Sequence, residues 1–125
     1  VLDLTKAWDS LQDEEGKSRL VTGVTIVNND FLAAHKDLVD AFLTEHEASI
    51  LFTQEEPDDA AALIEKAGIV AKAAISKKAL PACNISYLDG QEMKDALNGY
   101  LSVLFEQEPK AVGGSLPDDA FYYLP

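Results

Sequence analysis

One stretch of the chain, residues 19–30 with the sequence RLVTGVTIVNND, constrains the fold more than any other. It is rich in β-branched residues, and alternate positions from Leu20 to Ile26 would share one side, a pattern typical of a β-strand. A lone strand cannot satisfy its own backbone N–H and C=O groups, so it needs a neighbour. The segment CNISY, residues 83–87, is a thin candidate for that neighbour. The sequence therefore predicts one or two strands, and a pairing edge that another segment or another chain supplies.

Helical periodicity covers most of the remaining chain. Apolar residues recur three and four positions apart, and acidic residues, prolines and glycines stand where helices begin and end. The pattern predicts about five helices, over residues 4–16, 31–57, 56–69, 70–81 and 90–109. Their faces carry more apolar residues than one small bundle needs, which suits either a helical core or an interface with another segment. The predicted fold class is α+β and helix-rich, in a single domain of 125 residues.

The charge of the chain limits its partners. There are 22 acidic residues against 10 basic ones, for a net charge of −12, which argues against nucleic acid and anionic membrane surfaces. No apolar run approaches the ~20 residues of a membrane span. The chain starts at Val1 and not at Met, which suggests a fragment or a processed chain. Cys83 is the sole cysteine, so no internal disulfide forms, and we expect it to be a small buried hydrophobe.

No pattern of catalytic or metal-ligating residues stands out. His35 and His46 are eleven residues apart and do not form a His-x-x-x-His pair, so we expect exposed histidines and not metal ligands. Acidic clusters lie at predicted helix ends, where capping and solvation explain them. The segment VGGSLP, residues 112–117, lacks the phosphate-binding glycine patterns. The sequence predicts no enzyme activity, no metal and no cofactor.

The C-terminal tail raises a separate question. Its sequence, GGSLPDDAFYYLP at residues 113–125, begins with turn formers but then places Phe121, Tyr122 and Tyr123 in succession. A disordered tail rarely carries so much apolar area. We therefore expect these aromatic side chains to pack against the body of the protein.

Three pieces of the sequence, taken in order, carry a resemblance. A turn and helix pattern follows the predicted strand, at Phe31, Leu32, His35, Lys36, Asp37, Val39, Phe42, Leu43 and Ser49. A proline-led helix comes next, at Pro57, Ala60, Ala61, Leu63, Ile64, Gly68 and Ile69. The tail supplies the third piece, at Gly113, Gly114, Leu116, Pro117, Asp118, Asp119, Phe121, Tyr122 and Tyr123. In this order they resemble the later half of the periplasmic substrate-binding proteins of ABC importers. The nearest group is the nitrate, sulfonate, taurine and thiamine-precursor type, whose usual proline is replaced by Lys36.

The resemblance implies a fold and a place for each segment. The chain would be the C-terminal part of a two-lobed type II periplasmic-binding-protein fold. Residues 1–18 would end lobe two, residues 19–28 would form a hinge strand, and residues 29–125 would form the C-terminal helices and tail of lobe one. The tail would pack on a lobe that is built largely from an N-terminal half. That missing half, or a second copy of the chain with exchanged elements, would be a required partner.

The resemblance also implies a function. The protein would capture a small solute outside the cytoplasmic membrane by hinge closure and deliver it to an ABC permease, as a periplasmic protein or a membrane-anchored lipoprotein. The plausible ligand-binding residues lie at the hinge strand: Thr22, Gly23, Thr25 and Asn28. Strand propensity is the plainer explanation of the threonines, and helix capping is the plainer explanation of Asn28. The alternative function is an acidic helical protein-interaction module, which has no use for a strand. A small enzyme, the third idea, would show a closed polar pocket.

Overall fold

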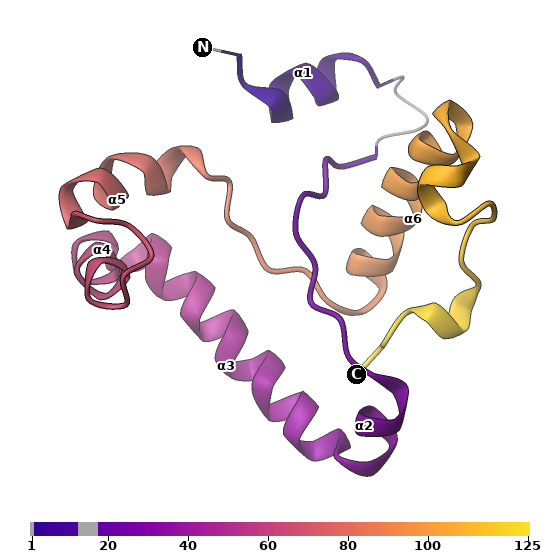
Figure 1. The fold of residues 1–125 in the computed structure, drawn as a ribbon, viewed down its shortest axis with the longest axis horizontal. Helices are drawn as coiled ribbons and strands as arrows, with labels where there is room; N and C mark the ends of the chain where they lie inside the picture. The colour runs from indigo at the N-terminus through magenta and orange to yellow at the C-terminus, as the bar shows by residue number, and fades with distance from the viewer. Residues whose placement is uncertain (1, 13–17) are drawn as a thin grey trace. The chain divides into compact units, whose positions relative to one another are not determined.

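The computed structural model describes residues 2–12 and 18–125, and Figure 1 shows its helices. Within these described residues, six α-helices run in the order α1 (Leu4–Ser10), α2 (Asn29–Ala34), α3 (Lys36–Glu55), α4 (Pro57–Lys66), α5 (Ala73–Ala79) and α6 (Gly90–Gln107). Three short 3₁₀ helices accompany them: η1 (Leu80–Ala82), η2 (Pro109–Val112) and η3 (Asp119–Phe121). The chain divides into two compact units. Unit 1 contains Val1–Ile26 and Leu88–Pro125, and unit 2 contains Val27–Tyr87.

The predicted α+β class is wrong, because the described residues contain no β-strand. Both candidate strands, residues 19–28 and 83–87, lie outside every helix and every β-strand of the described residues. Residues 19–26, which we call the open segment, form no backbone–backbone hydrogen bond with the described residues of unit 1. A β-branched pattern favours a strand but does not supply the neighbour that completes a ladder. The strand-containing part of a type II binding-protein fold is therefore not what this chain adopts.

Unit 1 is organised around α6. The side chain of Trp8, from α1, contacts Tyr100 on α6 with ring centroids 5.4 Å apart. The indole N–H of Trp8 also donates to the carbonyl oxygen and to the hydroxyl of Ser18, each at 3.1 Å. The hydroxyl of Ser18 in turn donates to the amide oxygen of Gln12 at 2.8 Å. These contacts fix the start of the open segment beside α6.

Gly99 permits this close approach. A Cβ atom at Gly99 would lie 3.0 Å from the Cβ of Ser18 and 3.3 Å from its Cα. The second distance is to the backbone, which cannot turn aside as a flexible side chain can. Ser18 is itself buried. Glycine in the middle of a helix normally costs stability, so its presence in α6 is explained by packing.

Unit 2 begins and ends its helices with local signals in the sequence. The side-chain oxygen of Asn28 caps α2 by accepting hydrogen bonds from the backbone N–H groups of Asp30 and Phe31. Pro57 is the first residue of α4, where its missing N–H is not needed. Beyond the end of α4, Gly68 has a φ of +71°. Its N–H and that of Ile69 donate to carbonyl oxygens in the last turn of α4, as in a Schellman cap.

Small side chains bring α4 and α5 together. Ala60 and Ala61 on α4 are buried, and so is Ser76 on α5. Around them, Lys77 forms an ion pair with Asp58 at 2.5 Å. The hydroxyl oxygen of Ser76 is buried without a hydrogen-bond partner among the described residues. That arrangement carries a desolvation cost that no contact offsets.

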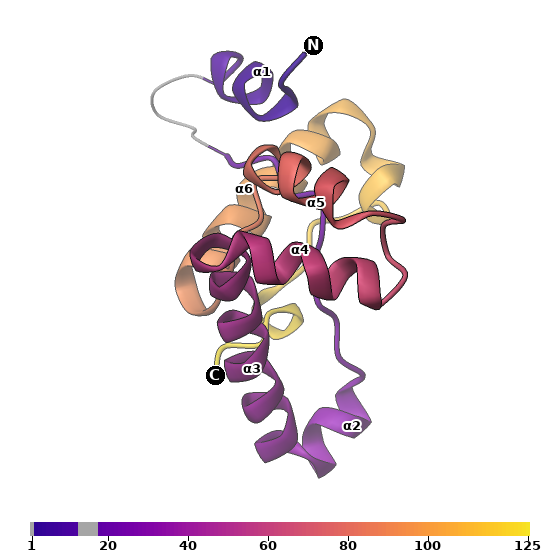
Figure 2. The same ribbon diagram turned by 90° about the vertical axis from the view of Figure 1, so that its left-hand side faces the viewer.

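The apolar side chains of the helices are only partly buried. Among the residues that the structure describes, five hydrophobic ones are buried: Val39, Ala60, Ala61, Ala96 and Tyr122. Sixteen large hydrophobic side chains in the described part of the chain are exposed, among them Leu38, Phe42 and Ile75. Figure 2 shows α3 with α2 near one end and α4 and α5 near the other. On α3, Leu38 and Phe42 are more than half exposed, whereas the neighbouring Val39 is buried.

We predict that Gly99→Val destabilises unit 1 by about 1–3 kcal/mol, because the added side chain must displace Ser18. Trp8 is the single tryptophan and contacts α6, so its fluorescence during urea unfolding reports on this unit. Glu106→Val, at an exposed position of the same helix, is the matched control for the cost of a β-branched residue. Equal urea midpoints for the two variants would contradict the close packing at Gly99.

We predict that Ser76→Ala stabilises the protein, because it removes a buried hydroxyl that has no partner. Serine to alanine also improves helix propensity, by up to about 0.5 kcal/mol. Ser49→Ala on α3, where the hydroxyl is exposed and donates to the carbonyl of Glu45, is the matched control for that gain. The gain from Ser76→Ala should exceed the control by about 1 kcal/mol in urea unfolding followed by circular dichroism. A loss of stability would show that the hydroxyl has a partner after all.

Candidate functional site

The ligand-binding residues expected from the sequence occupy two different settings. Thr22, Gly23 and Thr25 lie in the open segment of unit 1, and all three are exposed. Asn28 belongs to unit 2, and its side-chain oxygen is engaged in capping α2. Thr22, Gly23 and Thr25 are therefore close together only because they are neighbours in the sequence. Asn28 has a structural role as the N-cap of α2. Whether any of the four binds a ligand stays a prediction.

Gly23 leaves the main chain of the open segment uncovered. Its φ is outside the left-handed region, and a Cβ atom there would meet nothing within 4 Å. Neither backbone conformation nor packing therefore requires a glycine. Its effect is to expose backbone N–H and C=O groups between Thr22 and Thr25, whose hydroxyls can both donate and accept hydrogen bonds. Such a stretch can recognise a polar ligand without any charged group.

Contacts at its start hold the open segment in place. Ser18 is locked between Trp8 and Gly99, as described above. The next residue, Arg19, forms an ion pair with Glu92 on α6 at 2.9 Å. More than half of each of these two side chains is exposed, so the pair adds little stability and serves mainly to orient Arg19.

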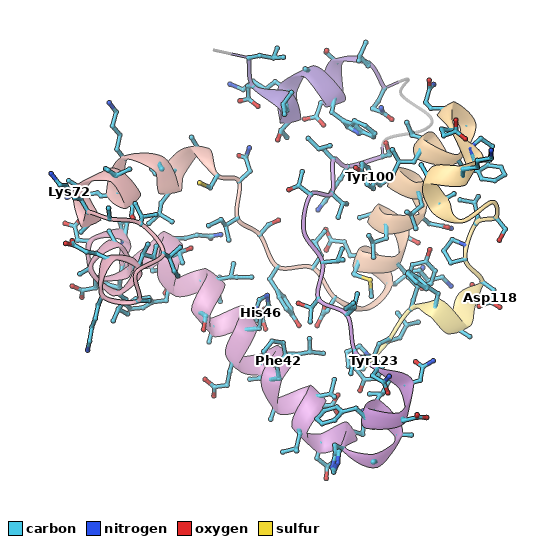
Figure 3. The ribbon with its side chains drawn as sticks, in the orientation of Figure 1. Phe42, His46, Lys72, Tyr100, Asp118 and Tyr123 are labelled. Carbon is cyan, nitrogen blue, oxygen red and sulfur yellow. The ribbon has the colours of Figure 1, made fainter. Side chains whose placement is uncertain are left out.

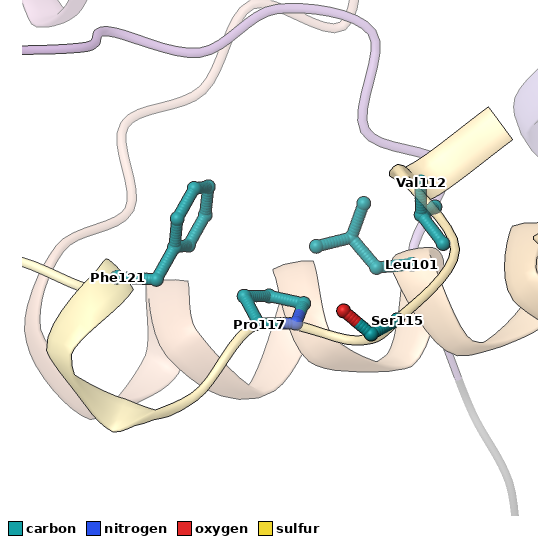
Figure 4. Close-up of a pocket in the computed structure, with 5 residues that line it drawn as sticks. All are labelled: Leu101, Val112, Ser115, Pro117 and Phe121. Atoms are coloured by element: carbon teal, nitrogen blue, oxygen red, sulfur yellow. The ribbon is translucent and has the colours of Figure 1, made fainter. Parts of the chain in front are cut away.

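The C-terminal tail folds back onto α6 and forms a shallow hollow. Leu101 of α6, Val112 of η2 and Phe121 of η3 line it, together with Ser115 and Pro117 from the connecting loop (Figure 4). The hollow has a volume of about 400 Å³ and is open to solvent. Its lining is mostly apolar, with the hydroxyl of Ser115 as the polar exception. The sequence did not indicate it, because it exists only when segments from both sides of η2 meet.

The tail answers the question that its aromatic residues raise. Tyr122 is buried, with only 7% of its surface exposed, whereas Phe121 is 61% exposed. The hydroxyl of Tyr122 donates to the side-chain oxygen of Asn98 on α6 at 3.3 Å. The body on which the tail packs is therefore at least partly α6 of the same chain, where an absent N-terminal half was expected to supply much of it.

A lysine and an aspartate fasten the tail beside this contact. Lys94 on α6 forms an ion pair with Asp119 on η3 at 2.8 Å, and its ammonium lies 5.8 Å from the ring centre of Tyr122. The hydrogen bond to Asp119 raises the pKa of Lys94 above its ordinary value. Burial raises the pKa of Tyr122, and the neighbouring Lys94 partly opposes that rise. Lys94 and Tyr122 therefore lose their protons at a higher pH in the folded protein than in the unfolded chain.

The histidines and the cysteine are placed differently from one another. His35 is exposed between α2 and α3, with its ring 4.8 Å from that of Phe31. His46 is half-buried and contacts Phe42 and Tyr87 at ring distances of 5.5 and 5.9 Å, and Figure 3 shows Phe42 and His46 on α3. The prediction of exposure therefore holds for His35 and not for His46. Cys83 is exposed, so its predicted burial is wrong.

Two kinds of site are not found in the described part of the chain. No group of three or more histidine, cysteine, aspartate or glutamate residues there is arranged to hold a metal ion. Over the same residues, no helix has the length and apolar character that a membrane crossing demands.

Comparison with models of protein families, with curated proteins and with solved structures found no match for this chain. The open segment offers exposed polar groups, and the hollow beside Leu101 offers an apolar surface.

We predict that the stability of unit 1 falls as the pH rises above about 10. Lys94 and Tyr122 hold their protons to a higher pH in the folded state than in the unfolded chain. Their contribution is therefore complete below the unfolded pKa values and is lost as the pH rises through the folded ones. Urea midpoints, measured by circular dichroism between about pH 9 and pH 11, should decline less steeply in Tyr122→Phe. Tyr123→Phe is the neighbouring control, and identical slopes in all three proteins would contradict the coupling.

Proposed function

We propose that this chain forms part of the solute-binding component of an ABC importer and acts outside the cytoplasmic membrane. The order of its sequence motifs supports this proposal, as set out above. The proposal no longer includes a strand, since the described residues have none. Its partners would be a small solute, an ABC permease, and a missing N-terminal half or a second copy of the chain.

The open segment is the observation that carries the proposal. It presents the hydroxyls of Thr22 and Thr25 and the bare backbone at Gly23, all exposed. Solute-binding sites typically combine backbone groups, hydroxyls and amides with apolar walls. A segment that is exposed from Thr22 to Ile26, uncharged beyond Arg19 and anchored at Ser18 offers such groups from a fixed starting point.

Capture would occur by hinge closure between two lobes, much of whose body the missing half would supply. It needs no covalent chemistry.

A second candidate function is an acidic helical protein-interaction module. The all-helical structure favours it, because the feature that argued against a helical module was the expected strand. The exposed apolar side chains of α3, with acidic residues between them, favour it further. The two candidates differ in the ligand: a small solute for the first and a protein surface for the second.

We predict that the double variant Thr22→Val/Thr25→Val weakens solute binding by the native gene product by about 10-fold, since each lost hydrogen bond contributes about 0.5–1.5 kcal/mol. Candidate solutes are first found by the thermal stabilisation that they cause, and affinities are then measured by isothermal titration. Thr44→Val is the control, because its hydroxyl already donates to the carbonyl of Asp40 within α3. An unchanged affinity would remove the open segment from the site.

The native gene product gives a separate check on the proposal. We expect its mass to exceed the 13.5 kDa of this chain, with an N-terminus processed for export. We also expect the 125-residue chain alone to bind solute more weakly than micromolar, since most ligand groups would come from the missing half. A native cytosolic product of this length that binds a helical protein would favour the second candidate.

A further inference from the structure

The hollow beside Leu101 has walls that the fold of unit 1 holds in place. Leu101 belongs to α6, and Val112 is the last residue of η2, where its β-branched side chain has few rotamers. The ring of Pro117 fixes its own φ. The ring of Phe121 meets the ring of the buried Tyr122 edge-on, with the ring centroids 5.2 Å apart. A ligand that binds here therefore has few side chains to order, which lowers the entropy cost of binding.

The size of the hollow suits a small molecule better than a protein. Its volume is about 400 Å³, within the range of about 300–1,000 Å³ that is usual for small-molecule sites. An apolar cavity of about 150 Å³ is large enough to bind benzene, so two fused rings fit in this one. Five of the described residues line the hollow, whereas a standard protein interface takes about 20–30 residues from each partner. The hollow alone is therefore too small to hold a second copy of the chain or another protein.

The chemistry of the lining favours an uncharged ligand. None of the described residues that line the hollow carries a charge. The two acidic residues between Pro117 and Phe121 have partners elsewhere: the side chain of Asp118 accepts from a backbone N–H in η3 at 3.0 Å, and Asp119 pairs with Lys94. A charged ligand would therefore lose hydration in the hollow without gaining a partner of opposite charge.

The hollow also offers one polar contact and one exposed aromatic ring. Ser115 is exposed, and Figure 4 shows it beside Pro117 and Leu101. Its hydroxyl can donate or accept a hydrogen bond. Phe121 is 61% exposed, so a ligand ring can pack against it in an offset or edge-on arrangement. Covering Phe121 also removes apolar surface from water.

We propose that the hollow binds a small uncharged aromatic molecule with one hydrogen-bonding group, of the phenol class. Its ring contacts the apolar walls, and its polar group bonds to the hydroxyl of Ser115. The inference goes beyond the proposed function, because the site lies between α6 and the tail and does not include the open segment. Ser115, Pro117 and Phe121 all come after η2, so a bound ligand also stabilises the tail on α6.

A titration with 2-naphthol tests the proposal, because this probe is uncharged at neutral pH and carries one hydroxyl on two fused rings. The isotope-labelled 125-residue chain is followed by NMR, and the largest shifts of backbone amide signals should fall on residues 112–115 and on Phe121. We expect a dissociation constant on the order of 1 mM for a ligand of this size. The anion 2-naphthalenesulfonate, which has the same rings, should bind at least about 10-fold more weakly.

Two variants with matched controls place the probe in the hollow. Leu101→Trp fills the hollow and should weaken 2-naphthol binding at least about 10-fold, whereas Gln107→Trp, at an exposed position of the same helix, should not. Ser115→Ala keeps the hollow open and should weaken binding about 3–10-fold, because it removes one hydrogen bond. Ser102→Ala is its control, since that hydroxyl already donates to the carbonyl oxygen of Asn98. Circular dichroism should show native helix content in all four variants.

Several outcomes would overturn the proposal. They are the absence of shifts at the hollow, equal binding of 2-naphthalenesulfonate, and unchanged 2-naphthol binding by Ser115→Ala. Shifts centred on residues 19–26 would also overturn it and would support the open segment as the solute site, so the two proposals can fail separately. A mass that rises with protein concentration, and that Leu101→Trp returns to the monomer value, would assign the hollow to a second copy of the chain.

Discussion

The close approach of Ser18 to Gly99 determines where the open segment starts, and much of unit 1 depends on it. Ser18 accepts the indole N–H of Trp8, so the same contact holds α1 near α6. The tail then docks on α6 through Asn98 and Lys94. Helix α6 is therefore the common support for α1, the open segment and the tail. A side chain at position 99 would separate α6 from the segment that presents the exposed threonines.

Short-range sequence signals predicted where helices begin and end. The sequence did not predict whether the expected strand would find a neighbour to pair with. Asn28, Pro57 and Gly68 act through hydrogen bonds and torsions within a few residues, so their roles could be inferred from the sequence alone. The strand at residues 19–28 was wrong, because its formation depends on a neighbour that no local pattern specifies. The sequence also did not indicate which face of α3 would be buried. Its apolar residues surround more of the helix than one packing contact covers, and Val39 is buried whereas Phe42, one turn further on, is 52% exposed.

The candidate site likewise contains residues that the sequence indicated and contacts that it did not. The sequence singled out Thr22, Gly23 and Thr25, and the structure shows that all three are exposed. The hollow beside Leu101 and the pairing of Lys94 with Asp119 could not be predicted, because they join residues whose proximity requires the tail to fold back. The aromatic tail was a usable signal that this folding occurs. It did not reveal that Tyr122, rather than Phe121, would be the buried residue.

Both candidate functions require that another protein covers part of this chain, and the exposed apolar side chains give a physical reason for it. The buried hydrophobic residues are few and mostly small, whereas many leucine, isoleucine and phenylalanine side chains are exposed. Covering such side chains contributes about 25 cal/mol per Å² of apolar surface removed from water, so a partner that covers them stabilises the chain as it binds. The acidic residues interspersed along α3 then favour partners that carry positive charge over other apolar surfaces. In this way the apolar side chains supply the driving force for association, and the surrounding charges select the partner.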